Sequence, residues 1–175
     1  MSNRHDLFAR MEEEKDAILE SVRALTKEER AFHPPSGWNA LQILEHILIS
    51  EKGTLGYMKK KTQLKAEEME VVDDQSREAT AQLVAALHSE NRWSAPSVLP
   101  EPTGAHSLDA LSEEWTLLRD DFRVFLHELP AEYDQRKVFN HPFSGRIGLL
   151  DTLDFLAGHI KHHAFQLDRL KQVLP

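Results

Sequence analysis

Residues 149–170 read LLDTLDFLAGHIKHHAFQLDRL, and this stretch decides the fold of the chain. Its apolar side chains recur at alternating spacings of three and four residues, which is typical of a helix packed along one face. The positions of this seam are Leu149, Leu153, Leu156, Ile160, His163, Leu167 and Leu170. The pattern predicts a buried helix from about Leu149 to Val173, with one histidine in an otherwise apolar seam.

A second stretch, residues 108–129, has the same periodicity with no polar interruption. Its seam consists of Leu108, Leu111, Trp115, Leu118, Phe122, Phe125 and Leu129. Ser107 precedes the stretch as a candidate N-cap, and Pro130 follows it and ends the helix. We expect Trp115 and Phe122 in the core and not at a ligand-binding surface, because aromatic side chains dominate protein cores.

Two further helices are predicted nearer the N-terminus. The first runs from about residue 2 to residue 25, and the second from about residue 38 to residue 61, with a proline-containing turn at residues 34–37 between them. The glutamates at residues 12–14 are expected on a solvated face of the first helix. The second helix is apolar over much of its circumference at residues 41–49, so we expect it to be well buried.

The connection from residue 62 to residue 105 is long and irregular. A shorter acidic helix is predicted over residues 74–90, and residues 91–106 contain three prolines and one glycine, which predicts a loop. A second loop is predicted around residues 141–145, HPFSG. Because a connection as long as the first can cross a bundle from end to end, the second and third long helices are expected to be parallel. The chain is therefore predicted to be an all-α, four-helix bundle forming a single domain over residues 1–175.

The composition limits the classes of partner. A net charge of -8 argues against a nucleic-acid backbone as partner, which would require a basic face. There are no cysteines, so disulfide bonds and cysteine catalysis are excluded. Residues 41–49 are too few to cross a membrane and include polar side chains. The N-terminal residues show no signal-peptide pattern, so we expect a cytoplasmic protein without a membrane partner.

Three histidines in apolar helical stretches form the candidate functional site. His159 and His163 are four residues apart, so they project from the same face of a helix and can bind one ion together. His162 points well away from the centre of that seam. His46, on the second helix, would be the third ligand of a site with open positions, as in catalytic metal centres.

Two interpretations of these histidines remain open from the residues alone. The face of the second helix that carries His46 also carries small and polar residues, including Ser50 and Gly53. This face is either a wet groove with room for a metal and a ligand, or simply exposed to solvent. His163 is either a metal ligand or a neutral core histidine that is hydrogen-bonded to a protein group.

The spacing of residues excludes several better-known sites. The metalloprotease motif HExxH requires a glutamate directly after its first histidine, where this chain has Ile160. No histidine has a glutamate three residues before it, which excludes the ferritin-like di-iron pattern. Neither GxGxxG nor a P-loop is present. The remaining arrangement is one ion held by three neutral imidazoles, which would polarise a carbonyl or lower the pKa of a bound water or thiol.

Three segments together resemble the DinB/YfiT-like superfamily of small bacterial proteins. The segments are residues 38–46 (WNALQILEH), 141–145 (HPFSG) and 159–170 (HIKHHAFQLDRL). The resemblance implies a four-helix bundle with up-down-down-up connectivity. It also implies a divalent ion, with zinc or nickel as the leading candidates, bound by one histidine on the second helix and two on the fourth. By position these ligands are His46, His159 and His163, with His46 facing inward.

The same resemblance implies a metal-dependent enzyme that acts on a small molecule by thiol transfer or hydrolysis, with a low-molecular-weight thiol as a candidate cofactor. It identifies no catalytic residue. Helical proximity makes Tyr57 and Gln166 candidates for contact with the metal ligands. Arg146 and Lys161 are the nearest cations in the sequence, and both are expected to face solvent. The alternatives are a non-catalytic binding or stress-response module and a helical bundle that forms homodimers.

Overall fold

The computed structural model describes residues 3–87 and 99–175, which are mostly helical. The α-helices are α1 (Arg4–Arg23), α2 (Lys27–Ala31), α3 (Ala40–Lys61), α4 (Asp74–Leu87), α5 (Leu108–Glu128) and α6 (Leu149–Lys171). The remaining elements are the 3-10 helices η1 (Ala66–Glu68) and η2 (Ala131–Gln135) and the strands β1 (Lys137–His141) and β2 (Gly145–Gly148). The helical class predicted from the sequence is confirmed.

The four long helices begin and end close to their predicted bounds. The acidic helix also begins at Asp74, as predicted, and is described as far as Leu87. The predicted end of that helix at residues 88–90, and the predicted loop as far as residue 98, lie outside the described residues. The turn at residues 34–37 is preceded by the short helix α2, which the sequence did not predict.

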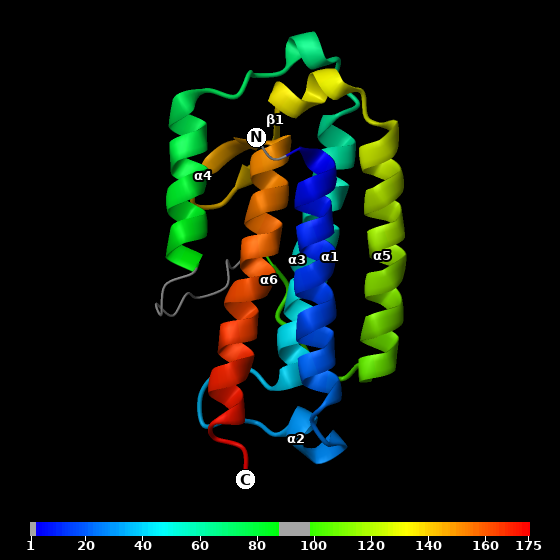
Figure 1. Ribbon diagram of the computed structural model, residues 1–175, viewed down its shortest axis with the longest axis vertical. Coiled ribbons are helices and arrows are strands. Elements are labelled where there is room, and N and C mark those ends of the chain that lie inside the picture. Colours follow the sequence, from blue (N-terminus) through cyan, green and yellow to red (C-terminus); the bar gives the residue numbers. More distant parts are fainter. Residues whose placement is uncertain (1–2, 88–98) are drawn as a thin grey trace.

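Helices α1, α3, α5 and α6 lie side by side, and α4 lies against α6 (Figure 1). In this view α1 and α6 run from the end of the molecule that holds the N-terminus toward the end that holds the C-terminus. Helices α3 and α5 run in the opposite direction (Figure 1). Helix α3 packs against both α5 and α6, so it presents two buried faces to two different neighbours.

Side-chain caps begin the helices where the sequence pattern placed them. At the start of α3, the Asn39 side chain accepts a hydrogen bond from the backbone N–H of Gln42 at 2.8 Å. The Gln42 side chain in turn accepts one from the backbone N–H of Asn39 at 3.1 Å. Ser107 caps α5 by accepting a hydrogen bond from the backbone N–H of Ala110 at 3.2 Å, as predicted. Caps of this kind stabilise a helix by about 1 kcal/mol.

The seams predicted for α5 and α6 form much of the core. Every residue of the α6 seam is buried, and His163 is only 6% exposed. In α5, Trp115 and Phe122 are 1% and 0% exposed, which confirms their assignment to the core. Each large apolar side chain buried in this way contributes about 1.5–3 kcal/mol relative to exposure in water.

One acidic side chain is not where the sequence analysis placed it. Glu12 was expected on a solvated face with Glu13 and Glu14, but it lies 3.4 Å from the guanidinium of Arg119, which is 1% exposed. The prediction is therefore wrong for Glu12, because the α1 face that carries it packs near α5. Glu13 is exposed, as expected, and Glu14 is partly buried.

The segment around HPFSG is a β-hairpin, where the sequence analysis predicted only a loop. Strands β1 and β2 pair in antiparallel fashion, with His141 opposite Gly145 at the turn. Gly145 has φ of 68°, a left-handed conformation that glycine adopts without a steric penalty. Pro142 and Gly145 thus mark a hairpin turn, and the strands beside them are too short to show a clear alternation in sequence. The hairpin packs against α3 and α6, which brings His141 to the side of the molecule that holds the other candidate histidines.

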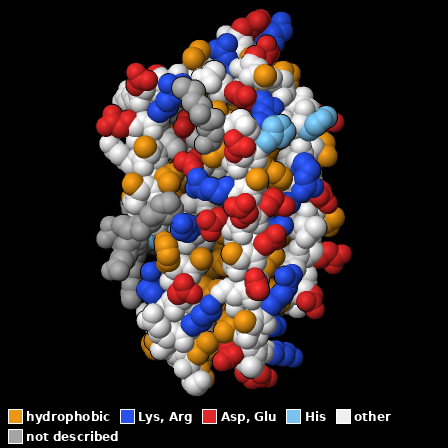
Figure 2. Space-filling model, viewed as in Figure 1, with side chains coloured by type: hydrophobic (Ala, Val, Ile, Leu, Met, Phe, Trp, Pro, Cys, Tyr) orange, Lys and Arg blue, Asp and Glu red, His pale blue; other side chains and the backbone are white. Residues whose placement is uncertain are grey.

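The face of the molecule seen in Figure 2 carries charges of both signs. Acidic and basic side chains are interspersed over the face shown in Figure 2. Among the described residues, no helix combines the length and the apolar character needed to cross a membrane.

Candidate metal centre

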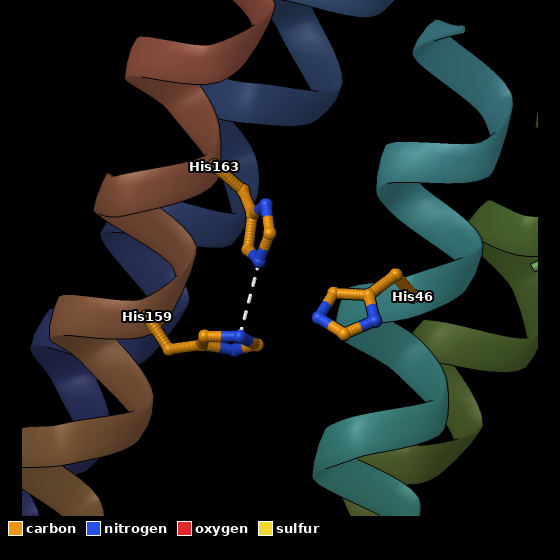
Figure 3. Close-up of side chains that lie close together, drawn as sticks. All are labelled: His46, His159 and His163. Carbon is orange, nitrogen blue, oxygen red and sulfur yellow. Dashed lines mark hydrogen bonds between the residues drawn. The ribbon is translucent and has the colours of Figure 1, made fainter. Parts of the chain in front are cut away.

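Helices α3 and α6 bring the three predicted histidines together. His159 and His163 extend from successive turns of α6, and His46 extends toward them from α3 (Figure 3). One ring nitrogen of each lies within 4.8 Å of a nitrogen of the other two. The Nε2 atoms of His159 and His163 are 3.0 Å apart. Two nitrogens that bind one ion at about 2.0–2.1 Å lie about 3 Å apart, so this pair already has the spacing of two metal ligands.

All three imidazoles are buried and neutral. His46 is 3% exposed, which excludes solvent exposure for His46 itself, although Gly53 on the same face of α3 is exposed. Burial, followed by the nearby His162, lowers the pKa of His46 to about 4. Burial, followed by the other histidines, lowers the pKa of His163 to about 3 and that of His159 well below its usual value. A neutral imidazole keeps a lone pair, which is the form that binds a metal ion.

Gln166 determines which nitrogen of His163 is available. The Oε1 atom of Gln166 lies 2.8 Å from Nδ1 of His163. An amide oxygen can only accept, so Nδ1 carries the proton and Nε2 keeps the lone pair that points toward His159. A hydrogen bond to the outer nitrogen is the arrangement that orients metal-binding histidines in proteins. Gln166 therefore contacts the site, whereas Tyr57 lies on the wall of the adjoining cavity.

No other group among the described residues closes the cluster. In the part of the chain that the structure describes, Nδ1 of His46 and Nδ1 of His159 are buried without a hydrogen-bond partner. A buried polar atom left in this way costs about 1–3 kcal/mol, so core histidines are ordinarily bonded. The alternative interpretation, a neutral core histidine that is hydrogen-bonded to a protein group, therefore holds in part for His163, which is bonded to Gln166. It does not hold for His46. The donor set fits one ion bound by three neutral imidazoles.

The three histidines open onto a cavity of about 1120 Å³. Much of its wall is apolar and aromatic, with Trp38, Phe139, Phe143 and Phe155 among the lining residues. The ring of Trp38 lies 4.6 Å from that of His46 and 6.3 Å from that of His163. Ser50 and Gly53 also line the cavity, as the groove interpretation of this face predicted. A cavity of this size and character is typical of a small-molecule site.

The two cations considered in the sequence analysis do not line this cavity. Lys161 is exposed, and Arg146 is exposed and paired with Glu70. Arg169, which the sequence analysis did not consider, is the one lysine or arginine among the described residues of the wall. It lies two turns of α6 beyond His162, a spacing that could have identified it.

Two other histidines also line the cavity, outside the cluster of three. His162 is buried and points away from the seam of α6, and its Nδ1 donates to the backbone carbonyl of Leu87 at 2.7 Å. His141 comes from the hairpin and was not predicted as a site residue. The only signal for it was its place in the HPFSG segment, since the hairpin that brings it to the cavity was not recognised.

Comparison with known protein families agrees with the family resemblance seen in the sequence. The chain matches the DinB superfamily over residues 10–167, which includes α3, α5, the hairpin and all three histidines. No curated protein and no solved structure matches it. Since the match spans most of the chain, the protein belongs to the DinB superfamily.

Proposed function

We propose that this protein is a metal-dependent enzyme that acts on a small molecule, with His46, His159 and His163 as the ligands of one divalent ion. Zinc and nickel are the leading candidates because the family resemblance implies them, and neutral imidazoles suit both ions as they also suit copper and iron. In the same proposal, α1, α3, α5 and α6 form the up-down-down-up bundle of a single domain. The substrate is a small molecule, and neither a nucleic acid nor a membrane is a partner.

The observation that carries the proposal is the open side of the histidine cluster. Three buried, neutral imidazoles converge at the wall of a cavity of about 1120 Å³, and no described carboxylate completes their coordination. A structural metal site would be closed by a fourth protein ligand, whereas a catalytic site keeps a position for a substrate or water. Among the described residues the cluster has three ligands and no fourth, which supports the second arrangement.

The residues around the cluster would hold the ligands and exclude water. Gln166 orients the ring of His163 through Nδ1, and Trp38 covers the rings of His46 and His163. With three neutral ligands the bound ion would keep its full positive charge and would lower the pKa of a thiol or water beside it. The low-polarity wall would strengthen that effect, since charges interact more strongly away from water.

Within this proposal, thiol transfer is favoured over hydrolysis. Hydrolysis by a metal-bound water is commonly assisted by a carboxylate base, and the one carboxylate among the described lining residues is that of Glu101, which is exposed. A thiolate is already a strong nucleophile and requires no such base. Because the chain has no cysteine, the thiol would belong to a separate small molecule.

The metal content of the protein tests the proposal. Untagged protein would be purified without added metal, incubated with zinc or nickel, desalted and measured by elemental analysis beside the His163→Ala variant. We expect about one ion per chain in the parent and little in the variant, because one of three ligands is lost. His127→Ala is the matched control, since His127 is exposed on α5 and should leave the metal content unchanged.

The result separates the proposal from its alternatives. A parent that stays empty after both incubations would make the three histidines structural polar groups and would favour a binding or dimerising bundle. A parent that binds metal but converts no thiol or ester substrate in activity screens would favour a binding module. Metal binding together with turnover that His163→Ala abolishes would support the enzyme.

A further inference from the structure

His141 stands on the cavity wall at the end of β1, away from the three metal-ligand candidates. It is 6% exposed and is surrounded by aromatic rings. Its ring lies 4.6 Å from that of Phe155, 5.8 Å from that of Phe143 and 6.3 Å from that of Phe139. A histidine in such an apolar setting must have its polar atoms accounted for.

The turn of the hairpin accounts for one of the two ring nitrogens. The backbone N–H groups of Phe143 and Ser144 both donate to Nδ1 of His141, each at 3.2 Å. Nδ1 is therefore an acceptor without a proton, and in a neutral imidazole the proton must be on Nε2. Burial lowers the pKa of His141 to about 4, so the ring is neutral at physiological pH. The hairpin thus holds His141 as an Nε2–H donor.

The second ring nitrogen of His141, Nε2, has no acceptor within residues 3–87 and 99–175. None of the described residues accepts a hydrogen bond from Nε2 of His141, although the side chain is more than nine-tenths buried. Since Nδ1 is directed into the turn and His141 lines the cavity, Nε2–H is the polar atom of this residue that a cavity ligand can reach. An unused donor in an apolar wall costs free energy until an acceptor meets it.

Phe155 lies between His141 and the candidate metal site. Its ring is 4.6 Å from that of His141 on one side and 5.6 Å from that of His159 on the other. Both Phe155 and His159 are on α6, one turn apart. A molecule that reaches from the three histidines to His141 must therefore pass the aromatic ring of Phe155.

We propose that His141 is a substrate-binding residue whose Nε2–H donates a hydrogen bond to the end of the substrate farther from the metal. The substrate class that fits is a small molecule with a metal-binding group at one end, an apolar or aromatic middle that packs on Phe155, and a carbonyl or carboxylate oxygen at the other end. The inference rests on the proposed function, and it adds the chemistry of the substrate to it.

Two substitutions distinguish the two functions of the His141 ring, which are the Nε2–H donor toward the substrate and the Nδ1 acceptor in the hairpin turn. His141→Asn keeps an oxygen that accepts the backbone N–H groups two and three residues on, as asparagine does in Asx-turns, but it places no donor at the position of Nε2. His141→Gln has the longer reach and keeps a donor near that position, but it loses the acceptor of the turn. A role in binding substrate and a role in the hairpin thus predict opposite rankings of the two variants.

The probes are 4-acetylthiophenol and thiophenol, which share a thiolate for the metal and an aromatic ring for Phe155. Only the first has a carbonyl acceptor. Each would be titrated calorimetrically into zinc-loaded parent, His141→Asn and His141→Gln. The acetyl group also changes the acidity of the thiol, and this change is the same for every protein. The quantity compared between proteins is therefore the ratio of the dissociation constant of 4-acetylthiophenol to that of thiophenol. We expect the ratio to shift by about fivefold to tenfold against 4-acetylthiophenol in His141→Asn, as for one lost hydrogen bond, and to stay near the parent value in His141→Gln.

The zinc content of the same samples distinguishes the possible failures. A zinc-loaded His141→Asn variant with the ratio of the parent would overturn the role of His141 alone. A loaded parent that binds neither thiol would overturn that role together with the preference for thiol transfer, but not the metal site. A shift in His141→Gln without one in His141→Asn would also overturn it and would make His141 a residue of the hairpin turn. A parent that holds no zinc would overturn the proposed function and this inference together.

Discussion

Helix α3 buries a polar side chain on each of two sides, and only one of the two, Glu51, has hydrogen-bond partners among the described residues. Toward α5, both oxygens of Glu51 accept hydrogen bonds, one from Nε1 of Trp115 at 2.8 Å and one from Nη2 of Arg119 at 2.7 Å. Toward α6, His46 faces two other histidines and forms no hydrogen bond with a described residue. Buried polar groups are normally satisfied. The Glu51 carboxylate is thus satisfied by the protein, although Nη1 of Arg119 has no hydrogen-bond partner among the described residues. The unbonded ring of His46 fits the proposed role of a metal ligand.

The two sides of α3 also differ in charge. Glu51 is 0% exposed, and burial raises the pKa of its carboxyl group while Arg119 opposes that rise. The histidines on the other side are uncharged, and no carboxylate faces them within the described cluster. A paired charge is costly to break, whereas a neutral base can accept an ion. The largest change in stability is therefore expected on the α5 side, and changes in metal binding are expected on the α6 side.

Glu51→Leu should produce the largest effect on stability. It leaves Arg119, which is 1% exposed, as a buried charge without the carboxylate that accepts its hydrogen bond. Breaking a buried pair in this way costs about 3–5 kcal/mol of unfolding free energy. Urea unfolding in the presence of a chelator would measure the loss without a contribution from bound metal.

The matched control is the double variant Glu51→Leu with Arg119→Met, which removes both charges. It should recover most of the lost stability, because an apolar pair can replace a buried ion pair at little cost. A single variant as stable as the parent would contradict the comparison, since it would mean that Arg119 does not depend on Glu51.

Gln166→Ala should have a smaller effect, limited to the metal side of α3. It removes the oxygen that accepts from Nδ1 of His163 at 2.8 Å. Loss of such an outer partner weakens metal binding by about 10–100-fold. We expect about tenfold, because Gln166 is only partly buried and water can take its place. Competition with a chromophoric chelator would measure the affinity for zinc.

Lys161→Ala is the control for Gln166→Ala, since Lys161 lies on the same helix and is exposed. Its affinity for zinc should equal that of the parent. Equal affinities in all three proteins would argue that the ring of His163 is oriented by packing against Trp38 and not by Gln166.

The sequence predicted the histidines between α3 and α6, but not the buried ion pair between α3 and α5. The seams of α5 and α6 were recognised because apolar side chains at helical spacing have one stable place, the core. His163 was noticed because it interrupts such a seam, and His159 because it lies one turn away. In contrast, Glu51 and Arg119 were not noticed, because charged residues on a helix are ordinarily exposed. Only the packing of α3 on α5 shows that these two residues meet.

The orientation of His46 and the role of His141 lay beyond the pattern of residues. Both sides of α3 are buried, so its apolar residues surround the helix and do not point to a single face. The inward position of His46 came from the family resemblance and is confirmed by its burial. His141 depends on a hairpin with strands of five and four residues, whose proline and glycine indicated a loop. Short strands have little periodicity, so tertiary contacts decide whether they form.

The last expected effect, which develops gradually with pH, concerns the acid sensitivity of the cavity side. In the unfolded chain His141 should titrate near its usual value of 6.5, whereas burial lowers the pKa to about 4 in the folded protein. Between these values the unfolded chain binds a proton that the folded protein does not, so this histidine makes the protein less stable as pH falls from about 6.5 to 4. His141→Asn lacks this contribution, so its stability should depend less on pH.

The unfolding free energy of His141→Asn and of the parent would be measured in urea at pH 7, 6 and 5 without metal. As pH falls, that of the variant should decrease less steeply, with a difference in slope of at most about 1.4 kcal/mol per pH unit. Parallel curves would mean that His141 takes up its proton in the folded state, which would contradict the neutral, Nε2-protonated ring on which the binding role of His141 depends.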